Sequence, residues 1–318
     1  MTQLRLSMPS DGALATPAEK FMRDCGLPIR RASQRRLTAD IPDMKDVVVF
    51  FQRASDITTA VDQGGPDIGI LGFDQFQESD QVSGDAVVLY ELGFGRSKVV
   101  FAVPEERSDW KNVRSVPELL NRLKNNGDNE EPVRIATKYP RLVNRFLDAS
   151  GRDVSRKSYR LIHIRGALEA VPSMGSADLI ADIKDTGMTM SDNRLVALDD
   201  DPIFSSQAVL IANAKTLGED VGKQEQTRSI LERMEAYNKA LPHFKITANY
   251  YLDDGESGSK EPNCPESVAK IITNDRRFAG LLGPTIARVY PKTAMKDDER
   301  RLIKDPERWY SVQMVVKK

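Results

Sequence analysis

The chain has 318 residues, of which 40% are hydrophobic and 29% are charged, and its formal net charge at pH 7 is −1. A chain of this length has room for roughly two or three structural units with cores of their own, and its nearly neutral charge gives no sign of a surface for nucleic acid or for an acidic membrane. Two cysteines and two histidines are too few for a disulfide framework, a multi-histidine metal site or a histidine-based catalytic triad.

The start of the chain, MTQLRLSMPSDG, lacks the long apolar core of a signal peptide. No stretch of the sequence approaches the ~20 apolar residues of a membrane-spanning helix. We therefore expect a cytoplasmic protein, or one in an organelle stroma after removal of a targeting segment that this sequence does not contain. Neither a membrane nor a nucleic acid is expected as a partner.

The first part of the chain alternates between apolar runs and amphipathic stretches. This pattern predicts strands that alternate with helices, and hence a largely parallel sheet. Strands are expected at 4–9, 46–53, 67–72, 86–90 and 98–103, and helices at 17–25 and 56–62. A strand, a turn and a helix at the start of a chain are typical of an α/β unit with ligand-binding groups at the strand end.

A second series of strands and helices follows around a polar run at 125–131. Helices are expected at 116–123 and 142–149, and strands at 133–137, 159–164, 177–183 and 204–212. The last of these strands is expected to return to the first sheet, so that two α/β lobes are joined by two crossings, as in type II periplasmic binding proteins. We place lobe I at about 1–103 and 195–222 and lobe II at about 104–194, within a domain that spans 1–222.

A separate small unit is expected over 223–318. It begins with an amphipathic helix at 225–241, whose apolar residues share one face and which Pro242 ends. The elements after this helix are expected to be a strand at 244–252, a helix at 266–273 and strands at 285–290 and 309–316. The β-α-β-β order predicts a small α+β domain.

The functional site is expected in the stretch from Gly166 to Asn193. The apolar run 177–183 reads as a short buried strand with Asp182 near its end. The turn after it holds two hydroxyl side chains and a glycine, and a helix is expected to start at Ser191 or Asp192. The turn residues are Asp185, Thr186, Gly187, Met188 and Thr189.

A loop of this composition at the carboxyl end of a strand gathers backbone N–H groups around a phosphate. Asp182 is then placed to accept hydrogen bonds from the hydroxyls of a sugar, and Glu169 is expected on the neighbouring rim. The spacing therefore indicates a phosphate-ribose pocket. The alternative is an ordinary strand and turn, because Thr-Gly pairs are common in turns.

The sequence of this stretch resembles the signature of the ATP phosphoribosyltransferases, the enzymes that catalyse the first step of histidine biosynthesis. That signature reads approximately E-x-A-x-x-x-G-x-A-D-x-I-x-D-x-x-x-[ST]-G-x-T-[LM]. The matching residues are Glu169, Gly175, Ala177, Asp178, Ile180, Asp182, Thr186, Gly187, Thr189 and Met190, with Ala170 shifted by one position. The resemblance implies a two-lobed catalytic domain like that of the type II periplasmic binding proteins.

Other segments are similar to the long form of this family. They are FFQRASDI, GGPDIGILGFD, LGFGRSKVVFAVP, RIATKYP, LLGPTIARVYP and WYSVQMVV. The last two resemble a third, ferredoxin-like domain (β-α-β-β-α-β) that binds histidine as a feedback inhibitor in the family. The resemblance implies a homo-oligomer, a hexamer built from dimers, with histidine as a candidate inhibitor. The family's last helix and strand are expected after WYSVQMVVKK, so the small domain is expected to be truncated.

The resemblance also implies a reaction. It is the Mg²⁺-dependent transfer of the 5-phosphoribosyl group from 5-phosphoribosyl 1-diphosphate to N1 of ATP, with release of diphosphate. The protein must hold the 5-phosphate, orient the ribose, and neutralise the diphosphate, and it needs no side-chain nucleophile. A metal site made by the protein alone is not expected.

The resemblance assigns roles to individual residues. The catalytic candidates are Asp182 on the ribose hydroxyls, Glu169 on the ribose or Mg²⁺, and Arg53 and Lys98 facing the diphosphate or triphosphate. The substrate-binding candidates are the turn residues Asp185, Thr186, Gly187, Met188 and Thr189 on the 5-phosphate, with Thr137, Lys138 and Tyr139 on the nucleotide side. Arg35 and Arg36 are candidates for steering ATP, whereas Asp178 is expected to be structural.

Each of these assignments has a plainer alternative. Asp182 could cap a turn, Glu169, Arg53 and Lys98 could be solvated surface charges, and Tyr139 could be a core aromatic.

The N-terminal turn, with Asp11 and Gly12 as further substrate-binding candidates, departs from the family. The family generally has P-x-K-G-[RA] there, whereas this chain has Pro9-Ser10-Asp11-Gly12-Ala13. A carboxylate that faces a diphosphate repels it by ~1–4 kcal/mol, depending on burial. Two other functions therefore stay open: a catalytically impaired, nucleotide-binding regulatory paralogue, and a solute-binding module of the same two-lobed shape.

Overall fold

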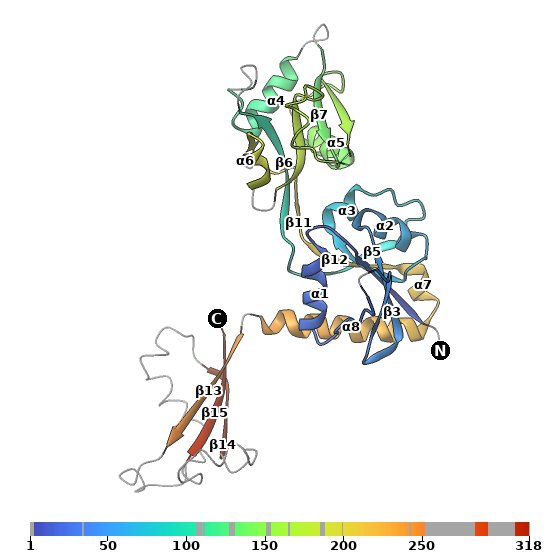
Figure 1. The fold of residues 1–318 in the computed structure, drawn as a ribbon, viewed down its shortest axis with the longest axis vertical. Helices are drawn as coiled ribbons and strands as arrows, with labels where there is room; N and C mark the ends of the chain where they lie inside the picture. The colour runs from blue at the N-terminus through green and yellow to red at the C-terminus, as the bar shows by residue number, and fades with distance from the viewer. Residues whose placement is uncertain are drawn as a thin grey trace. The chain divides into compact units, whose positions relative to one another are not determined.

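The computed structural model describes residues 3–33, 35–105, 110, 112–126, 131–150, 154–164, 166–184, 188–198, 200–241, 243–251, 284–291 and 309–317. They fall in two compact units, Met1–Met234 and Glu235–Lys318, and helix α8 (Val221–Ala240) crosses the division (Figure 1). The sequence placed this boundary at 222. It lies later because the first part of α8 packs on lobe I, where Ile230 and Met234 are buried.

Lobe I is built on a six-stranded sheet with the order β2-β3-β1-β4-β12-β5. The central strand β1 is parallel to β3 and β4, whereas β2, β12 and β5 pair antiparallel with their neighbours. The strands are β1 (Leu4–Pro9), β2 (Thr38–Ile41), β3 (Met44–Gln52), β4 (Ile68–Gly72), β5 (Ala86–Glu91) and β12 (Ala208–Asn213), and the helices are α1 (Ala15–Asp24), α2 (Ala54–Asp62), α3 (Phe73–Glu78) and α7 (Ala214–Gly218). Leu4, Leu6 and Met8 of β1 are fully buried.

Lobe II has a sheet with the order β10-β6-β9-β7-β8, and β11 pairs with β6 beside this path. Strand β7 is parallel to β8 and β9, and β6 is antiparallel to β9. The strands are β6 (Ser97–Pro104), β7 (Val133–Thr137), β8 (Tyr159–His163), β9 (Leu179–Lys184), β10 (Leu195–Leu198) and β11 (Phe204–Ser206), and the helices are α4 (Val116–Asn125), α5 (Pro140–Ala149) and α6 (Met188–Asp192).

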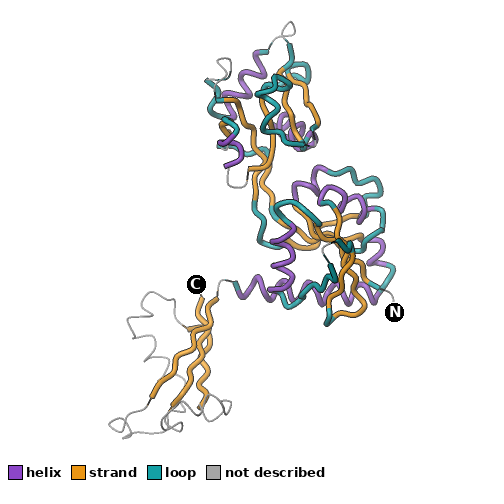
Figure 2. Tube along the Cα trace, viewed as in Figure 1, coloured by secondary structure: helices purple, strands orange, loops and turns teal. Residues whose placement is uncertain are grey.

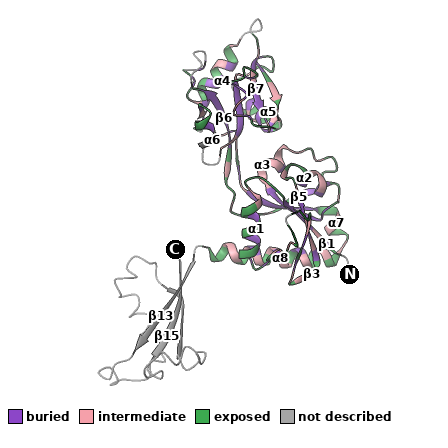
Figure 3. Cartoon of the chain, in the orientation of Figure 1, coloured by how far each residue is buried: buried purple, intermediate pink, exposed green. Residues whose placement is uncertain are grey.

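Burial follows the strands in both lobes. Figure 2 shows strands alternating with helices in each lobe, and Figure 3 shows that the strands carry most of the buried residues. Lobe II has a hydrophobic cluster on each side of its sheet. One contains Val99, Phe101 and Leu179, and the other contains Val100 and Ile180. Neighbouring residues of one strand thus point into opposite clusters, as the pleat of a strand requires.

Both lobe boundaries differ from those expected from the sequence, which were 103/104 and 194/195. Strand β6 pairs with β9, β10 and β11, so 97–104 belongs to lobe II and not to lobe I. The segment 195–206 also belongs to lobe II, and the chain re-enters lobe I only at β12. The expected single strand 204–212 is two strands, β11 and β12, which lie in different sheets. An apolar run shows that a strand is buried but does not show which sheet it joins.

The two lobes share a local motif that the sequence analysis missed. In lobe I, Arg5 donates from its backbone N and Nε to Asp67 Oδ2 and from Nη2 to Oδ1. In lobe II, Arg134 makes the same three contacts to Asp178. Each arginine is the second residue of its strand, and each acid directly precedes a parallel neighbour. The expected structural role of Asp178 agrees with these contacts.

The described residues of the second unit form a three-stranded sheet. Its strands are β13 (His243–Tyr251), β14 (Pro284–Pro291) and β15 (Trp309–Lys317), and β15 lies between the other two and is antiparallel to both. Two parallel strands with a third strand between them are typical of a split β-α-β unit, which is part of a ferredoxin-like domain. The expected helix at 266–273 lies outside the described residues.

The fold class expected from the sequence is confirmed. The first unit is a two-lobed α/β structure of the type II periplasmic-binding-protein kind, with a mixed sheet in each lobe. Within the described ranges, no helix is both long enough and apolar enough to cross a membrane.

Candidate active site

The carboxyl ends of β7 and β9 bring two of the expected residues together. These strands are parallel neighbours, with Thr137 opposite Ala181, so Lys138 follows one strand end where Asp182 lies near the other. Lys138 Nζ donates to Asp182 Oδ2 at 3.2 Å. The Asp182 side chain is 8% exposed and that of Lys138 is 37% exposed. An ion pair therefore lies at the edge of the sheet, with the acid inside and the cation reaching out.

The surroundings of Asp182 make its carboxylate unusually basic. Burial raises the pKa of Asp182, and the negative charge of Glu169 adds to this rise. The Lys138 ammonium and the Ile183 N–H, which donates to Asp182 Oδ1 at 2.8 Å, oppose the increase in pKa without cancelling it. A basic, mostly buried carboxylate is a strong acceptor for hydroxyl donors. The structure thus brings Asp182 and Lys138 into contact, with the charge of Glu169 close enough to act on Asp182.

The turn after β9 lies only partly within the described residues. Asp185, Thr186 and Gly187 lie outside them, while Met188 and Thr189 are the first residues of α6. The helix was expected to start at Ser191 or Asp192, and it starts at Met188 instead. The described part of the stretch is therefore a strand that ends near Lys138, and a helix that begins at Met188.

Lys98 lies on the strand next to this turn. In the register of β6 and β9 it stands opposite Lys184, and in the register of β6 and β11 opposite Ser205. Its side chain is exposed. Two lysines on neighbouring strands, Lys98 and Lys184, thus lie at this edge of lobe II.

The edge of the lobe I sheet brings together Asp11, Gly12 and Arg53. Strands β1 and β3 are parallel with Pro9 opposite Gln52, so the residues that follow each strand leave the sheet side by side. Ser10 N donates to Gln52 O at 2.7 Å and fixes this arrangement. Gly12 has a φ of +78°, which favours glycine, and both Asp11 and Arg53 are exposed.

An arginine-rich segment lies next to the end of β3. The Arg31 guanidinium lies 4.1 Å from the centroid of the Phe51 ring, and Arg36 Nε donates to Thr38 Oγ1 at 3.1 Å. Arg35 is exposed. Arg35 and Arg36 were candidates from the sequence, whereas Arg31 was not, because nothing in the local pattern indicates its contact with a ring about 20 residues later.

Thr137 and Tyr139 differ from the expectation that they line the nucleotide side. Thr137 is fully buried, and its Oγ1 accepts from Tyr139 N at 2.9 Å. Tyr139 is 2% exposed, and its ring packs in the core of lobe II. Its hydroxyl donates to Asp74 Oδ2 at 3.1 Å. In this structure Lys138 is the member of the trio whose side chain reaches the edge.

Asp74 was not singled out from the sequence, although a signal for it existed. It follows the buried strand β4 by two residues, and Asp182 likewise lies at the end of the buried strand β9. Asp182 was therefore a catalytic candidate from the sequence, whereas Asp74, at a similar position, was not a candidate. Both acids are buried in the structure.

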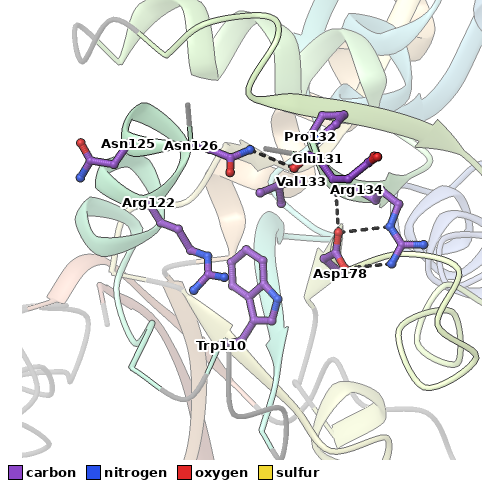
Figure 4. Close-up of a pocket in the computed structure, with 9 residues that line it drawn as sticks. All are labelled: Trp110, Arg122, Asn125, Asn126, Glu131, Pro132, Val133, Arg134 and Asp178. Atoms are coloured by element: carbon purple, nitrogen blue, oxygen red, sulfur yellow. Dashed lines mark hydrogen bonds and ion pairs between the residues drawn. The ribbon is translucent and has the colours of Figure 1, made fainter. Parts of the chain in front are cut away.

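A cavity of about 780 Å³ lies elsewhere in lobe II (Figure 4). Trp110, Arg122, Asn126 and the Arg134–Asp178 pair line it, and the Arg122 guanidinium lies 4.1 Å from the Trp110 ring centroid. Arg134 stands near the start of β7 and Asp178 directly precedes β9, so the cavity is at the end of the sheet opposite to Asp182. This cavity is not the candidate site, because Asp182 and Lys138, the residues expected to bind substrate, lie at the opposite end of the sheet.

The chain was compared with known proteins. A family model described as HisG, ATP phosphoribosyltransferase, matches residues 53–236. ATP phosphoribosyltransferase 1, chloroplastic, of Arabidopsis thaliana is 33% identical over 91% of this chain and 66% of its own length. The ATP phosphoribosyltransferase of Chelativorans sp. is 36% identical over 66% of this chain and 90% of its own length.

A solved structure gives the same result. The ATP phosphoribosyl transferase (HisG:HisZ) complex from Thermotoga maritima superposes with a TM-score of 0.54 and 26% identity, over 74% of this chain and 99% of that chain.

The matched region contains most of the candidate site. It includes Arg53, Lys98, the end of β7 and the whole stretch from Glu169 to Thr189, whereas Asp11 and Gly12 precede it. This chain spans just under two thirds of the length of the Arabidopsis relative. Because the family model matches more than half of the chain, and relatives above 30% identity align over most of it, the chain belongs to the ATP phosphoribosyltransferase (HisG) family.

Proposed function

We propose that this protein is an ATP phosphoribosyltransferase that acts in histidine biosynthesis. It transfers the 5-phosphoribosyl group of 5-phosphoribosyl 1-diphosphate to N1 of ATP and releases diphosphate. The observation that carries the proposal is the ion pair of Asp182 and Lys138 at the carboxyl ends of β7 and β9, in a chain of this family. In the reaction the N1–C1 bond forms while the bond from C1 to the diphosphate oxygen breaks.

Asp182 is assigned to the ribose. Its carboxylate is basic because it is buried, and it lies beside the turn that we assign to the 5-phosphate. Hydroxyls of the ribose can donate to it, which holds the ring in one orientation. Holding a reactant in the correct orientation removes a large entropic part of the barrier. Lys138, already paired with Asp182, keeps the carboxylate oriented and adds positive charge for the phosphate.

The leaving diphosphate needs positive charge. Lys98 supplies it from lobe II and Arg53 from the strand-end edge of lobe I. Mg²⁺ in proteins is commonly held by one or two carboxylates together with substrate phosphates, and the carboxylates of Glu169 and Asp182 are of the kind that this donor set needs. Glu169 and Asp182 would hold such an ion, and the ion would neutralise charge on the diphosphate.

The test is the assay of both substrates with Mg²⁺, in the presence of a diphosphatase, followed by the ultraviolet absorbance of the product. Asp182→Asn keeps the shape of the side chain and removes its charge, so we expect a loss of kcat of about 100-fold or more. The matched control is Asp148→Asn, which changes an exposed acid on α5. This variant should keep the activity of the wild type. Equal activity in Asp182→Asn and the wild type would refute the assignment.

A second function is favoured by one observation. Asp11 is exposed at the strand-end edge beside Arg53, at a position where the resemblance to the family implies a lysine. A catalytically impaired paralogue that binds 5-phosphoribosyl 1-diphosphate without turnover would explain an acid at this position. Binding without product formation by the wild type, with a gain of activity in Asp11→Lys, would support this function over the first.

Regulation, assembly and compartment are further parts of the proposal. Inhibition by histidine is tested by adding histidine to the assay, and a hexamer built from dimers is tested by light scattering. We propose the cytoplasm or an organelle stroma as the compartment, in line with relatives that include a chloroplastic enzyme. Each of these can fail without affecting the assignment of Asp182.

A further inference from the structure

The two lobes are joined by a buried hydrogen-bond network at the start of helix α5. Tyr139 of lobe II donates through its hydroxyl to Asp74 Oδ2 of lobe I at 3.1 Å. Gln75 Nε2 donates to the same hydroxyl at 3.0 Å and to Asp74 Oδ2 at 3.1 Å. Tyr139 is 2% exposed and Asp74 is 4% exposed, so water competes little for these bonds.

Asp74 has a second partner in the lobe II sheet. Ser206, the last residue of β11, donates from Oγ to Asp74 Oδ1 at 2.6 Å and accepts from Asp74 N at 2.9 Å. Strand β11 pairs with β6, with Ser206 opposite Ser97. The carboxylate of Asp74 therefore receives one hydroxyl from each of two parts of lobe II.

Helix α5 also depends on lobe I for its first turn. Its own N-cap residue, Tyr139, makes no side-chain cap, and Pro140 has no N–H to offer. Glu78 of α3 accepts from Arg141 N at 2.9 Å and from Leu142 N at 3.0 Å. A helix of one lobe is thus capped by a carboxylate of the other, which fixes the axis of α5 relative to α3.

This network lies between the two edges of the candidate site. Tyr139 comes directly after Lys138, whose ammonium is bonded to Asp182. Asp74 comes at the end of β4, a neighbour of β1 in the lobe I sheet. Arg53 and the Asp11 turn follow other strands of that sheet. The distance between the edge with Asp182 and the edge with Arg53 is therefore set in part by the bond between Tyr139 and Asp74.

We propose that Tyr139 is a positioning residue for the transfer reaction, and that its hydroxyl sets the relation between the lobes by its bond to Asp74. This inference rests on the proposed function. Tyr139 touches neither substrate, because its ring lies in the core and its hydroxyl is bonded to Asp74 and Gln75. Two substrates held by different edges react only when the edges are correctly aligned.

The chemistry of the hydroxyl suits this role. Burial raises the pKa of Tyr139, and the negative charges of Asp74 and Asp182 raise it further. The raised pKa favours the protonated phenol, which is the form that donates to Asp74. Tyr139→Phe removes the hydroxyl, which is the donor to Asp74 and an acceptor for Gln75, and leaves the ring in the core. Asp74 keeps Ser206 and Gln75 as partners, so the variant creates no unsatisfied carboxylate.

The experiment measures the distance between the lobes and the kinetics of the reaction separately. Spin labels are placed on Val82→Cys in lobe I and Met174→Cys in lobe II, which are 84% and 72% exposed in the wild type. The background carries Cys25→Ala and Cys264→Ser. Pulsed electron spin resonance of the full chain then gives the distribution of distances between the lobes. We expect Tyr139→Phe to broaden or shift this distribution.

In the kinetic assay we expect kcat of Tyr139→Phe to fall about tenfold, the effect of losing one buried hydrogen bond, while KM for each substrate changes less than about twofold. Asp74→Asn should reduce kcat as well. In the double variant the two losses should be less than additive, because they remove the same bond.

Tyr159→Phe is the matched control. Like Tyr139, Tyr159 is buried, but its hydroxyl donates to Asn144 Oδ1 at 2.9 Å, within lobe II. We expect this variant to keep both the distances and kcat. An unchanged distance distribution in Tyr139→Phe, or a changed one with normal kcat, overturns the proposal, and so does a rise in KM at constant kcat. If the wild type has no transferase activity, the proposed function fails, and the distances still decide whether the bond sets the relation between the lobes.

Discussion

Replacing Asp67 by asparagine tests the motif that the two lobes share. Asp67 is fully buried, and it receives three bonds from Arg5 and one from Lys223 of α8 at 2.8 Å. These contacts keep the pKa of Asp67 below its usual value, although burial alone would raise it. Asparagine would leave two cations facing a neutral amide. Removal of one partner from a buried ion pair costs ~3–5 kcal/mol, so we expect a loss of that size.

Urea unfolding of the full chain, followed by circular dichroism, measures the loss. With an m-value of ~3 kcal/mol/M for a unit of this size, the midpoint of the first unit should fall by about 1–2 M. The control is Asp24→Asn, which removes an exposed ion pair with Lys20 in the same lobe and should shift the midpoint little.

Asp178→Asn tests the equivalent pair in lobe II. Asp178 has a side chain 15% exposed, against 0% for Asp67, whose second partner Lys223 is only 12% exposed, so the loss at Asp178 should be smaller. A midpoint for Asp67→Asn within about 0.3 M of the wild type would refute the view that this carboxylate is a buried centre of charge.

Three further predictions concern other groups. Burial raises the pKa of Cys25 to about 12, so in a Cys264→Ser background its thiol should react with a disulfide reagent at pH 8 about 100-fold or more slowly than in urea. Backbone N–H donors lower the pKa of Asp62, so its contribution to stability is present above its unfolded pKa and is lost as the pH falls through the folded value. Thermal unfolding of Asp62→Asn should therefore differ from the wild type at pH 7 and converge with it in strong acid. Ser115→Ala, which breaks the capping box of α4, should cost ~1 kcal/mol in urea unfolding.

Local patterns were enough to predict the strand that carries Asp182. The apolar run before Asp182 and the polar turn after it gave a strand and a loop, because both signals lie within a few consecutive residues. The parallel pairing of β7 and β9 then brought Lys138 to Asp182, two residues assigned from separate segments. The ends of apolar runs can be recognised in the sequence, but the contact between these two residues was not predicted, because it depends on which strands pair.

Pairings between distant segments were not predictable in the same way. The burial of β6 was clear from its sequence, but its choice of lobe depends on β9, β10 and β11, which no local pattern reveals. Tyr139 shows the same limit at the level of one side chain. Its partner Asp74 is 65 residues away, and an aromatic residue after a strand reads equally as a ligand contact or as core.

The contacts between the lobes are unequal in strength, and this decides where variants will act. Arg141 also pairs with Asp80, but both side chains are at least half exposed. Exposed pairs of this kind contribute ~0–1 kcal/mol, because water and salt screen them. The bond between Tyr139 and Asp74 is buried on both sides, so its loss is not replaced by water. Asp80→Asn should therefore leave the distances between the lobes unchanged where Tyr139→Phe alters them, and the same pair of spin labels can compare the two variants. If Asp80→Asn moved the lobes as much as Tyr139→Phe, the surface charges of α3 and α5 and not the buried hydroxyl would set their relation.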